Sequence, residues 1–96
     1  MLGPIDSARL GSVSRAVVRV LAFAGARDVV GAPEVIVELS KERTAGDMFE
    51  SILARYPGLG PYRGCIRLAV NGAYASLDEP VKAGDEIALI PPVAGG

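Results

Sequence analysis

Short runs of alternating apolar and polar residues near the start of the chain predict two β-strands. Residues 16–23, Ala-Val-Val-Arg-Val-Leu-Ala-Phe, are rich in β-branched side chains, and every second one would fall on a wholly apolar face. Residues 34–39 alternate valine and leucine with glutamate and isoleucine. Between these runs, residues 24–30 can form a short helical turn closed by Gly31, because glycine readily adopts the left-handed cap conformation. We expect a strand pair with a longer connection.

The middle of the chain has helical spacing. Apolar side chains recur three or four residues apart over residues 48–56. Thr44 precedes them and stands three residues before Asp47, which is an acidic form of the capping box that begins helices. A Pro-Gly pair follows the run, and proline disfavours helical geometry in the residue before it. We therefore expect one amphipathic helix over residues 45–56.

The last third of the chain returns to strand-like alternation. Residues 65–70 place alternate apolar side chains on one face. Asn71-Gly72 predicts a type I′ turn, whose two central residues need positive φ angles, so the second strand of a tight hairpin should follow over residues 74–77. After two further turns, residues 86–90 form the last predicted strand.

This order of elements predicts an α+β fold with one main helix against a small sheet. A helix with a single apolar stripe covers only one sheet face. The other face would carry Leu21 and Phe23. In the strand predicted over residues 65–70, Arg67 lies on the face opposite the one that holds the alternate apolar residues. Exposed apolar patches usually mark binding surfaces, so we expect a protein partner there. The alternative is that the N-terminal extension or a loop covers this face.

Length and composition favour one intracellular domain. The 96 residues suit a single core, with residues 1–15, rich in Gly, Ser and Pro, as a flexible extension and residues 16–96 as the domain. The start of the chain lacks the basic and apolar regions of a secretory signal, and no apolar run reaches the roughly 20 residues that span a bilayer. A single cysteine fits a reducing compartment, so we expect a cytoplasmic protein.

Charge and residue content exclude several functions. A net charge of −1 offers no basic field for nucleic acid or an anionic membrane. The chain has no histidine and only Cys65, so it lacks the commonest general base and any cysteine-rich zinc site. We expect no metal and no bound cofactor. The acidic pairs Asp78/Glu79 and Asp85/Glu86 lie in predicted turns, where we expect them to be solvated.

Two further motifs are interpreted as structural. Residues 58–64, Gly-Leu-Gly-Pro-Tyr-Arg-Gly, resemble a nucleotide-binding glycine motif, but the last glycine comes one place late and the segment follows a helix. We expect a loop. Cys65 begins an apolar strand, and free cysteines are usually buried hydrophobic residues, so a redox role is not expected.

The C-terminus is the main chemical candidate. After the last strand the chain reads Pro91-Pro92-Val93-Ala94-Gly95-Gly96. The prolines favour an extended direction, and glycines without a Cβ can enter a narrow slot. Residues 91–96 are therefore predicted to project as a tail into another protein's active site. Its α-carboxylate, with a pKa of about 3.3–3.7, would be ionised at pH 7 and able to attack an activated phosphate.

With this ending, the chain resembles the MoaD/ThiS sulfur-carrier family, and within it most closely the small subunits of molybdopterin synthase. The resemblance covers nearly all of residues 17–96 and implies the ubiquitin-like β-grasp fold, a mixed sheet packed on one main helix. The most specific part is the Pro-Pro-Val-x-Gly-Gly ending. The segments that carry the resemblance are Val18-Arg19-Val20-Leu21-Ala22-Phe23-Ala24, Arg27-Asp28, Gly31, Leu68-Ala69-Val70-Asn71-Gly72, Gly84-Asp85-Glu86-Ile87-Ala88 and residues 91–96.

The resemblance implies a function for the tail. In the family, the terminal carboxylate, here that of Gly96 beside Gly95, is adenylated with ATP by a ubiquitin-activating-type enzyme and converted to a thiocarboxylate. The thiocarboxylate then gives its sulfur to cyclic pyranopterin monophosphate in the active site of the large synthase subunit, within a heterotetramer. The catalytic residues belong to that large subunit, so this chain is not an enzyme on its own.

The resemblance also implies partner contacts. Phe23 occupies the place of a family aromatic residue in the first strand, and Leu21 and Ile90 are neighbouring apolar sheet positions. Arg27 corresponds to a family arginine near the interface, although a solvated cation is an equal alternative. The partner would also bind the tail through Pro91, Pro92, Val93 and Ala94.

Three other functions stay open at this stage. A thiamine-pathway sulfur carrier would share the fold and the terminal diglycine. A ubiquitin-like modifier would be joined through Gly96 to lysines of target proteins. A plain interaction module would have an inert tail.

Overall fold

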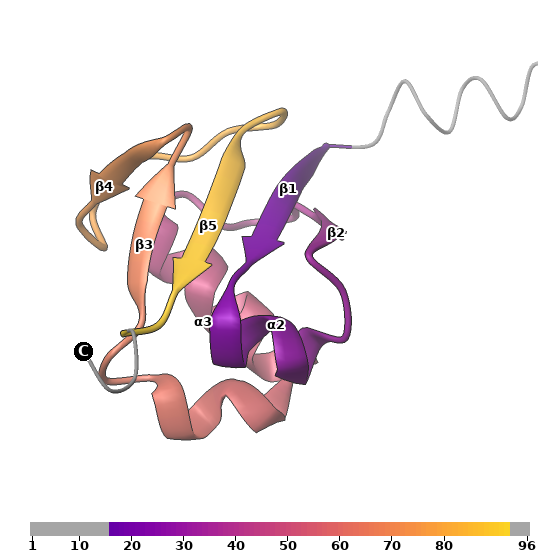
Figure 1. Ribbon diagram of the computed structural model, residues 1–96. Coiled ribbons are helices and arrows are strands. Elements are labelled where there is room, and N and C mark those ends of the chain that lie inside the picture. The colour runs from indigo at the N-terminus through magenta and orange to yellow at the C-terminus, as the bar shows by residue number, and fades with distance from the viewer. Residues whose placement is uncertain (1–15, 93–96) are drawn as a thin grey trace, which may run out of the picture.

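The computed structural model describes residues 16–92, so the predicted N-terminal extension and residues 93–96 of the predicted tail lie outside the described residues. Eight elements follow one another, with helices between the strands of a single sheet (Figure 1). In chain order they are β1 (Val17–Ala22), α2 (Ala24–Val30), β2 (Glu34–Glu38), α3 (Ala45–Arg55), the 3₁₀ helix η1 (Pro57–Tyr62), β3 (Arg67–Val70), β4 (Ala73–Ala75) and β5 (Glu86–Ile90).

The sheet is mixed, and its strand order is β2-β1-β5-β3-β4. β1 pairs antiparallel with β2 and parallel with β5, whereas β3 is antiparallel to both β4 and β5. The first and last strands of the fold therefore lie side by side near the centre of the sheet. Helix α3 lies across one face (Figure 1). The predicted α+β arrangement, a mixed sheet on one main helix, is confirmed.

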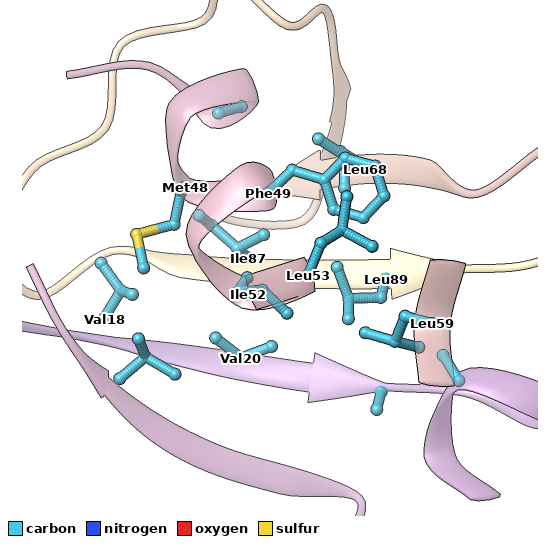
Figure 2. Packing of buried hydrophobic residues seen from close by; sticks show 14 of the residues in the cluster. Val18, Val20, Met48, Phe49, Ile52, Leu53, Leu59, Leu68, Ile87 and Leu89 are labelled. Carbon is cyan, nitrogen blue, oxygen red and sulfur yellow. The ribbon is translucent and has the colours of Figure 1, made fainter. Parts of the chain in front are cut away.

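The core lies between this sheet face and α3 (Figure 2). Successive side chains of a strand point to opposite faces, so alternate residues of β1 and β5 are buried together. Helical spacing brings one stripe of α3 onto the same layer, and η1 adds Leu59 at one end. The largest side chains that are fully buried are Val18, Val20, Val37, Met48, Ile52, Leu59, Ile87 and Leu89.

The capping box predicted for α3 is present. The Asp47 backbone N–H donates to Thr44 Oγ1 over 3.1 Å, and the Thr44 N–H donates to Asp47 Oδ2 over 3.3 Å. These bonds satisfy backbone donors that a helix N-terminus leaves without intrahelical partners. The helix ends at Arg55, one residue before the predicted end, with Tyr56 as its C-cap.

The predicted type I′ turn is confirmed, but the strand after it is shorter than expected. Asn71 and Gly72 have φ angles of 52° and 87°. β4 covers Ala73–Ala75 rather than residues 74–77, because the carbonyls that follow bond elsewhere. The Leu77 carbonyl accepts from the Gly46 N–H over 2.8 Å at the start of α3. The prediction of strand structure through residue 77 was wrong for this reason.

The segment between α3 and β3 also differs from the prediction. Residues 57–62 form a 3₁₀ helix where a loop was expected. The N–H groups of Cys65 and Ile66 both donate to the Tyr62 carbonyl over 2.9 Å, so this turn delays the start of β3 to Arg67. Cys65 is consequently exposed rather than buried in a strand.

Candidate protein-binding surface

The root of the predicted tail is fixed at the centre of the sheet. β5 is hydrogen-bonded to β1 on one side and β3 on the other, and it ends at Ile90. Pro91 is buried and Pro92 is exposed. The Phe23 N–H donates to the Leu89 carbonyl over 3.3 Å, which ties the end of β1 to the end of β5. The chain therefore leaves the sheet beside Phe23.

The last four residues of the predicted tail, Val93, Ala94, Gly95 and Gly96, lie outside the described residues. Their predicted role as a carboxylate-bearing projection stays a prediction.

A row of apolar side chains crosses the sheet face opposite α3. Strand pairing places Leu21 beside Ala88, Ala88 beside Ala69, and Ala69 beside Tyr74. The two alanines are each only 7% exposed, whereas Tyr74 in the edge strand is 64% exposed. We call these four residues the apolar row. They lie on the sheet face away from α3, whose buried side chains pack against the other face.

Beside this row is a hollow of about 310 Å³ at the corner between β1 and α2. It contains Leu21, Phe23 and Arg27, three residues that the sequence assigned to a partner interface. Phe23 is 47% exposed, which is unusual for so large an apolar side chain and favours a binding role. Ile90, Pro91 and Pro92 do not line the hollow. The hollow is lined by Leu21, Ala22, Phe23, Ala24, Arg27, Pro33 and Glu34.

The backbone at this corner is strained. Phe23 is extended, with φ −123° and ψ 153°, and the next residue, Ala24, has a φ of 50°. The left-handed region costs a non-glycine residue about 1–2 kcal/mol. The strain accompanies an abrupt change of direction from strand to helix, which leaves the Phe23 ring at the corner instead of in the core. Strained backbone of this kind tends to occur at binding sites.

The charges of this face are arranged in two ways. Arg19 is held by two carboxylates, with Nε 3.2 Å from Glu34 Oε2 and an Nη atom 3.1 Å from Glu86 Oε1. Arg67 instead lies over the ring of Tyr74, 4.3 Å from its centroid. Tyr74 and Arg67 were not predicted as site residues. Strand alternation does predict their faces, but it does not show which strands are neighbours.

A second hollow, of about 680 Å³, lies between α3 and the β3–β4 hairpin. Two of its three acidic residues have structural partners: Asp47 caps α3, and Glu50 forms an ion pair with Arg63, whereas Asp78 is exposed. Within residues 16–92, no group of three His, Cys, Asp or Glu side chains is placed to hold a metal ion.

Two carboxylates outside these hollows have lowered pKa values. The Ser51 hydroxyl donates to Glu42 Oε2 over 2.6 Å and holds the pKa of Glu42 below its ordinary value. Asp85 is buried, which corrects the expectation that it is solvated. The Asn71 side chain and then the Lys82 N–H lower the pKa of Asp85.

In the part of the chain that the structure describes, no helix is long and apolar enough to cross a membrane.

Comparison with known families matches residues 20–96 to the ThiS family. The chain belongs to this family. The MoaD/ThiS resemblance seen in the sequence is thereby confirmed over the whole matched segment.

Named relatives of this ThiS-family chain include sulfur carriers and a protein modifier. The molybdopterin synthase sulfur carrier subunit of Drosophila yakuba is 42% identical over 82 residues, covering 82% of this chain and 90% of that protein. Small archaeal modifier protein 1 of Haloferax volcanii is 35% identical over 82 residues, covering 77% of this chain and 94% of that protein.

Solved structures confirm the fold of this ThiS-family chain. The crystal structure of SAMP1 from Haloferax volcanii has a TM-score of 0.72 at 32% identity, covering 83% of this chain and 99% of that chain. A chain from the complex of subunits 1 and 2 of the molybdopterin-converting factor of Helicobacter pylori has a TM-score of 0.59 at 28% identity, covering 83% and 99%. A Caldiarchaeum subterraneum ubiquitin, at 22% identity, 0.57 TM-score and coverage of 86% and 100%, shows the ubiquitin-like fold alone.

Proposed function

We propose that this chain is the sulfur-carrier small subunit of a molybdopterin synthase, and that the terminal carboxylate of Gly96 carries the transferred sulfur. The observation that carries the proposal is that the Pro-Pro-Val-Ala-Gly-Gly ending follows directly from β5, a strand bonded on both sides in the middle of the sheet. The fold anchors the tail, and the reagent is the chain end itself. The sulfur-carrier relatives support this proposal.

The chemistry proceeds in three steps. A carboxylate oxygen of Gly96 attacks the α-phosphate of ATP on a ubiquitin-activating-type enzyme and expels pyrophosphate. A sulfur nucleophile then displaces AMP from the acyl carbon and leaves a thiocarboxylate. In the large subunit the thiocarboxylate sulfur bonds to a carbon of cyclic pyranopterin monophosphate, and water then cleaves the acyl C–S bond, which leaves the sulfur on the pterin and restores the Gly96 carboxylate. This chain contributes no general base, since its sequence contains no histidine and its described carboxylates are mainly structural.

The large subunit docks on the apolar row and on the hollow at Phe23. Leu21 belongs to both, and Phe23 and Arg27 lie in the hollow. Ile90 adjoins the row and leads into Pro91. Docking there would bury the exposed part of Phe23 and guide residues 91–96 into the partner's active site. A solved complex of two molybdopterin-converting-factor subunits, one of which shares this fold, supports such a pairing. The assembly is proposed to be a cytoplasmic heterotetramer.

A protein-modifier function is the second candidate. It is favoured by the similarity to small archaeal modifier protein 1. The same activated Gly96 would then form an isopeptide bond with a target lysine instead of receiving sulfur. A thiamine-pathway carrier would receive sulfur in the same way but deliver it to a different acceptor.

Mass spectrometry distinguishes these functions. The full chain is incubated with its activating enzyme, ATP and a sulfur donor. A mass gain equal to one sulfur-for-oxygen exchange at Gly96 is the expected result, whereas an isopeptide-linked ladder would indicate the modifier. No change would mean an inert tail.

A second incubation identifies the acceptor. The thiocarboxylate form, mixed with the large subunit and the pyranopterin precursor, should yield molybdopterin. Failure to do so while sulfur is loaded would favour thiamine supply.

A further inference from the structure

Arg67 is an exposed cation beside the point where the tail begins. Strand pairing places Arg67 directly opposite Ile90, the last residue of β5. It follows that Arg67 lies on the same sheet face as Ile90, two residues before Ala69 of the apolar row. Any protein that covers the row and takes the tail must pass over this guanidinium.

Arg67 has no carboxylate partner among residues 16–92. Its recorded contact is the ring of Tyr74, 4.3 Å from the guanidinium carbon. Two other arginines near the sheet are paired: Arg19 with Glu34 and Glu86, and Arg63 with Glu50. Among residues 16–92, the positive charge of Arg67 is therefore one that no carboxylate of the fold compensates beside the root of the tail.

The contact with Tyr74 also restricts the guanidinium. A cation stacked on an aromatic face is held by the ring quadrupole, and its N–H groups point outward in the guanidinium plane. That geometry suits bidentate bonding to a carboxylate. Because stacking already restricts the Arg67 side chain, forming such a bond costs less side-chain entropy.

Docking on the apolar row would remove water from Arg67. Burying a charge is costly unless it is paired and hydrogen-bonded. A partner that binds the exposed Phe23 ring and the apolar row would also cover Arg67. Because Arg67 then loses its water, the partner surface must supply a hydrogen-bond acceptor at the root of the tail. A carboxylate satisfies both the charge and the planar donor geometry.

We propose that Arg67 is a specificity-determining residue that pairs with a carboxylate of the large synthase subunit, next to the opening that receives the tail. This inference rests on the proposed function. Tyr74 positions Arg67 for this bond, and the apolar row supplies the surrounding dry contact.

The test compares Arg67→Gln and Arg67→Glu with wild-type chain for binding to the purified large subunit at low and high salt. Arg67→Gln should raise the Kd about tenfold or more and flatten its salt dependence, and Arg67→Glu should raise the Kd further. Arg63→Gln is the matched control, because Arg63 is also an exposed arginine but is ion-paired with Glu50 of α3, and its Kd should match the wild type.

Two readouts keep the test decisive. Thermal unfolding of the Arg67 variants should match the wild type within a few degrees, so weaker binding is not loss of fold. A Kd for Arg67→Gln within twofold of the wild type, or an unchanged salt slope, overturns the inference. Sulfur loading of wild-type Gly96 is measured in parallel: absent loading overturns the proposed function, whereas normal loading with unchanged binding overturns only the inference for Arg67.

Discussion

The side chain of Asn71 donates from Nδ2 to Asp85 Oδ1 over 3.0 Å and so joins the β3–β4 turn to the start of β5. The same amide accepts from the Glu86 N–H at Oδ1 over 3.0 Å. Asp85 Oδ2 accepts from the Lys82 N–H over 2.9 Å. One asparagine therefore fixes both the position of β5 and the ionised form of a buried carboxyl.

This bond predicts a pH dependence of stability. The Asn71 hydrogen bond, followed by the Lys82 N–H, holds the pKa of Asp85 below its ordinary value of 3.8. Because the folded pKa is the lower one, the carboxylate stabilises the fold above the unfolded pKa, and this contribution is lost as pH falls through the folded pKa. Asp85→Asn should lose about 1–3 kcal/mol at pH 7.

The measurement is urea unfolding at pH 7 and at acid pH. The difference between Asp85→Asn and wild type should shrink as the pH falls below the unfolded pKa. Asp78→Asn, an exposed acid in the preceding turn, should have little effect at either pH. A difference that persists unchanged in acid would contradict the role given to Asp85.

Gly25 is required by close packing between α2 and η1. A Cβ built at Gly25 would lie 2.6 Å from Tyr62 Oη and 2.9 Å from Tyr62 Cζ. Gly25→Ala would gain about 1 kcal/mol of helix propensity but must displace a ring packed on the core. Overpacking costs about 1–3 kcal/mol, so we expect a net loss of stability by urea unfolding.

Gly60→Ala is the matched control for Gly25→Ala. No atom lies within 4 Å of a Cβ at Gly60 in η1. Its stability should stay near that of the wild type. Equal stability of the two alanine variants would show that the Tyr62 contact does not constrain α2.

Replacing the two phenylalanines should affect different properties: stability of the free protein for Phe49, and partner binding for Phe23. Phe49 is 6% exposed in the core, and Phe23 is 47% exposed at the corner of β1. Phe49→Ala should destabilise the free protein by about 3–5 kcal/mol. Phe23→Asp should weaken the complex with the large subunit more than it lowers stability. Equal losses of binding and stability in Phe23→Asp would place this ring in the core.

The terminal residue should affect chemistry without affecting the fold. Deleting Gly96, or adding one residue after it, moves the reactive carboxylate relative to the anchored end of β5. Sulfur loading measured by mass spectrometry should be lost, whereas the unfolding transition should match the wild type. Undiminished loading of either variant would contradict the proposed mechanism.

Local signals in the sequence predicted local structure well. The Thr44/Asp47 capping box and the helical spacing located α3 to within one residue at its C-terminal end. Asn71-Gly72 predicted the type I′ turn, since few other residue pairs tolerate two positive φ angles. The strand ends were less predictable, because β4 stops where Leu77 bonds to Gly46, a residue 31 positions earlier in the chain.

The candidate site was only partly predictable. Leu21, Phe23 and Arg27 lie within a few residues of one another, and the resemblance to sulfur carriers pointed to them. Arg67 and Tyr74 join the same face only through the order of strands and their register. That register depends on contacts distant in sequence, which alternation within one strand does not show.

The two hydrogen-bonded flanks of β5 also have a mechanical meaning. A partner that binds the C-terminal residues and later releases them exerts a pulling force on Ile90. Because β1 runs parallel to β5 and β3 runs antiparallel to it, that tension acts along both ladders and shears many bonds together. The domain can thus withstand a pull on its last residues through repeated cycles of binding and release without unfolding.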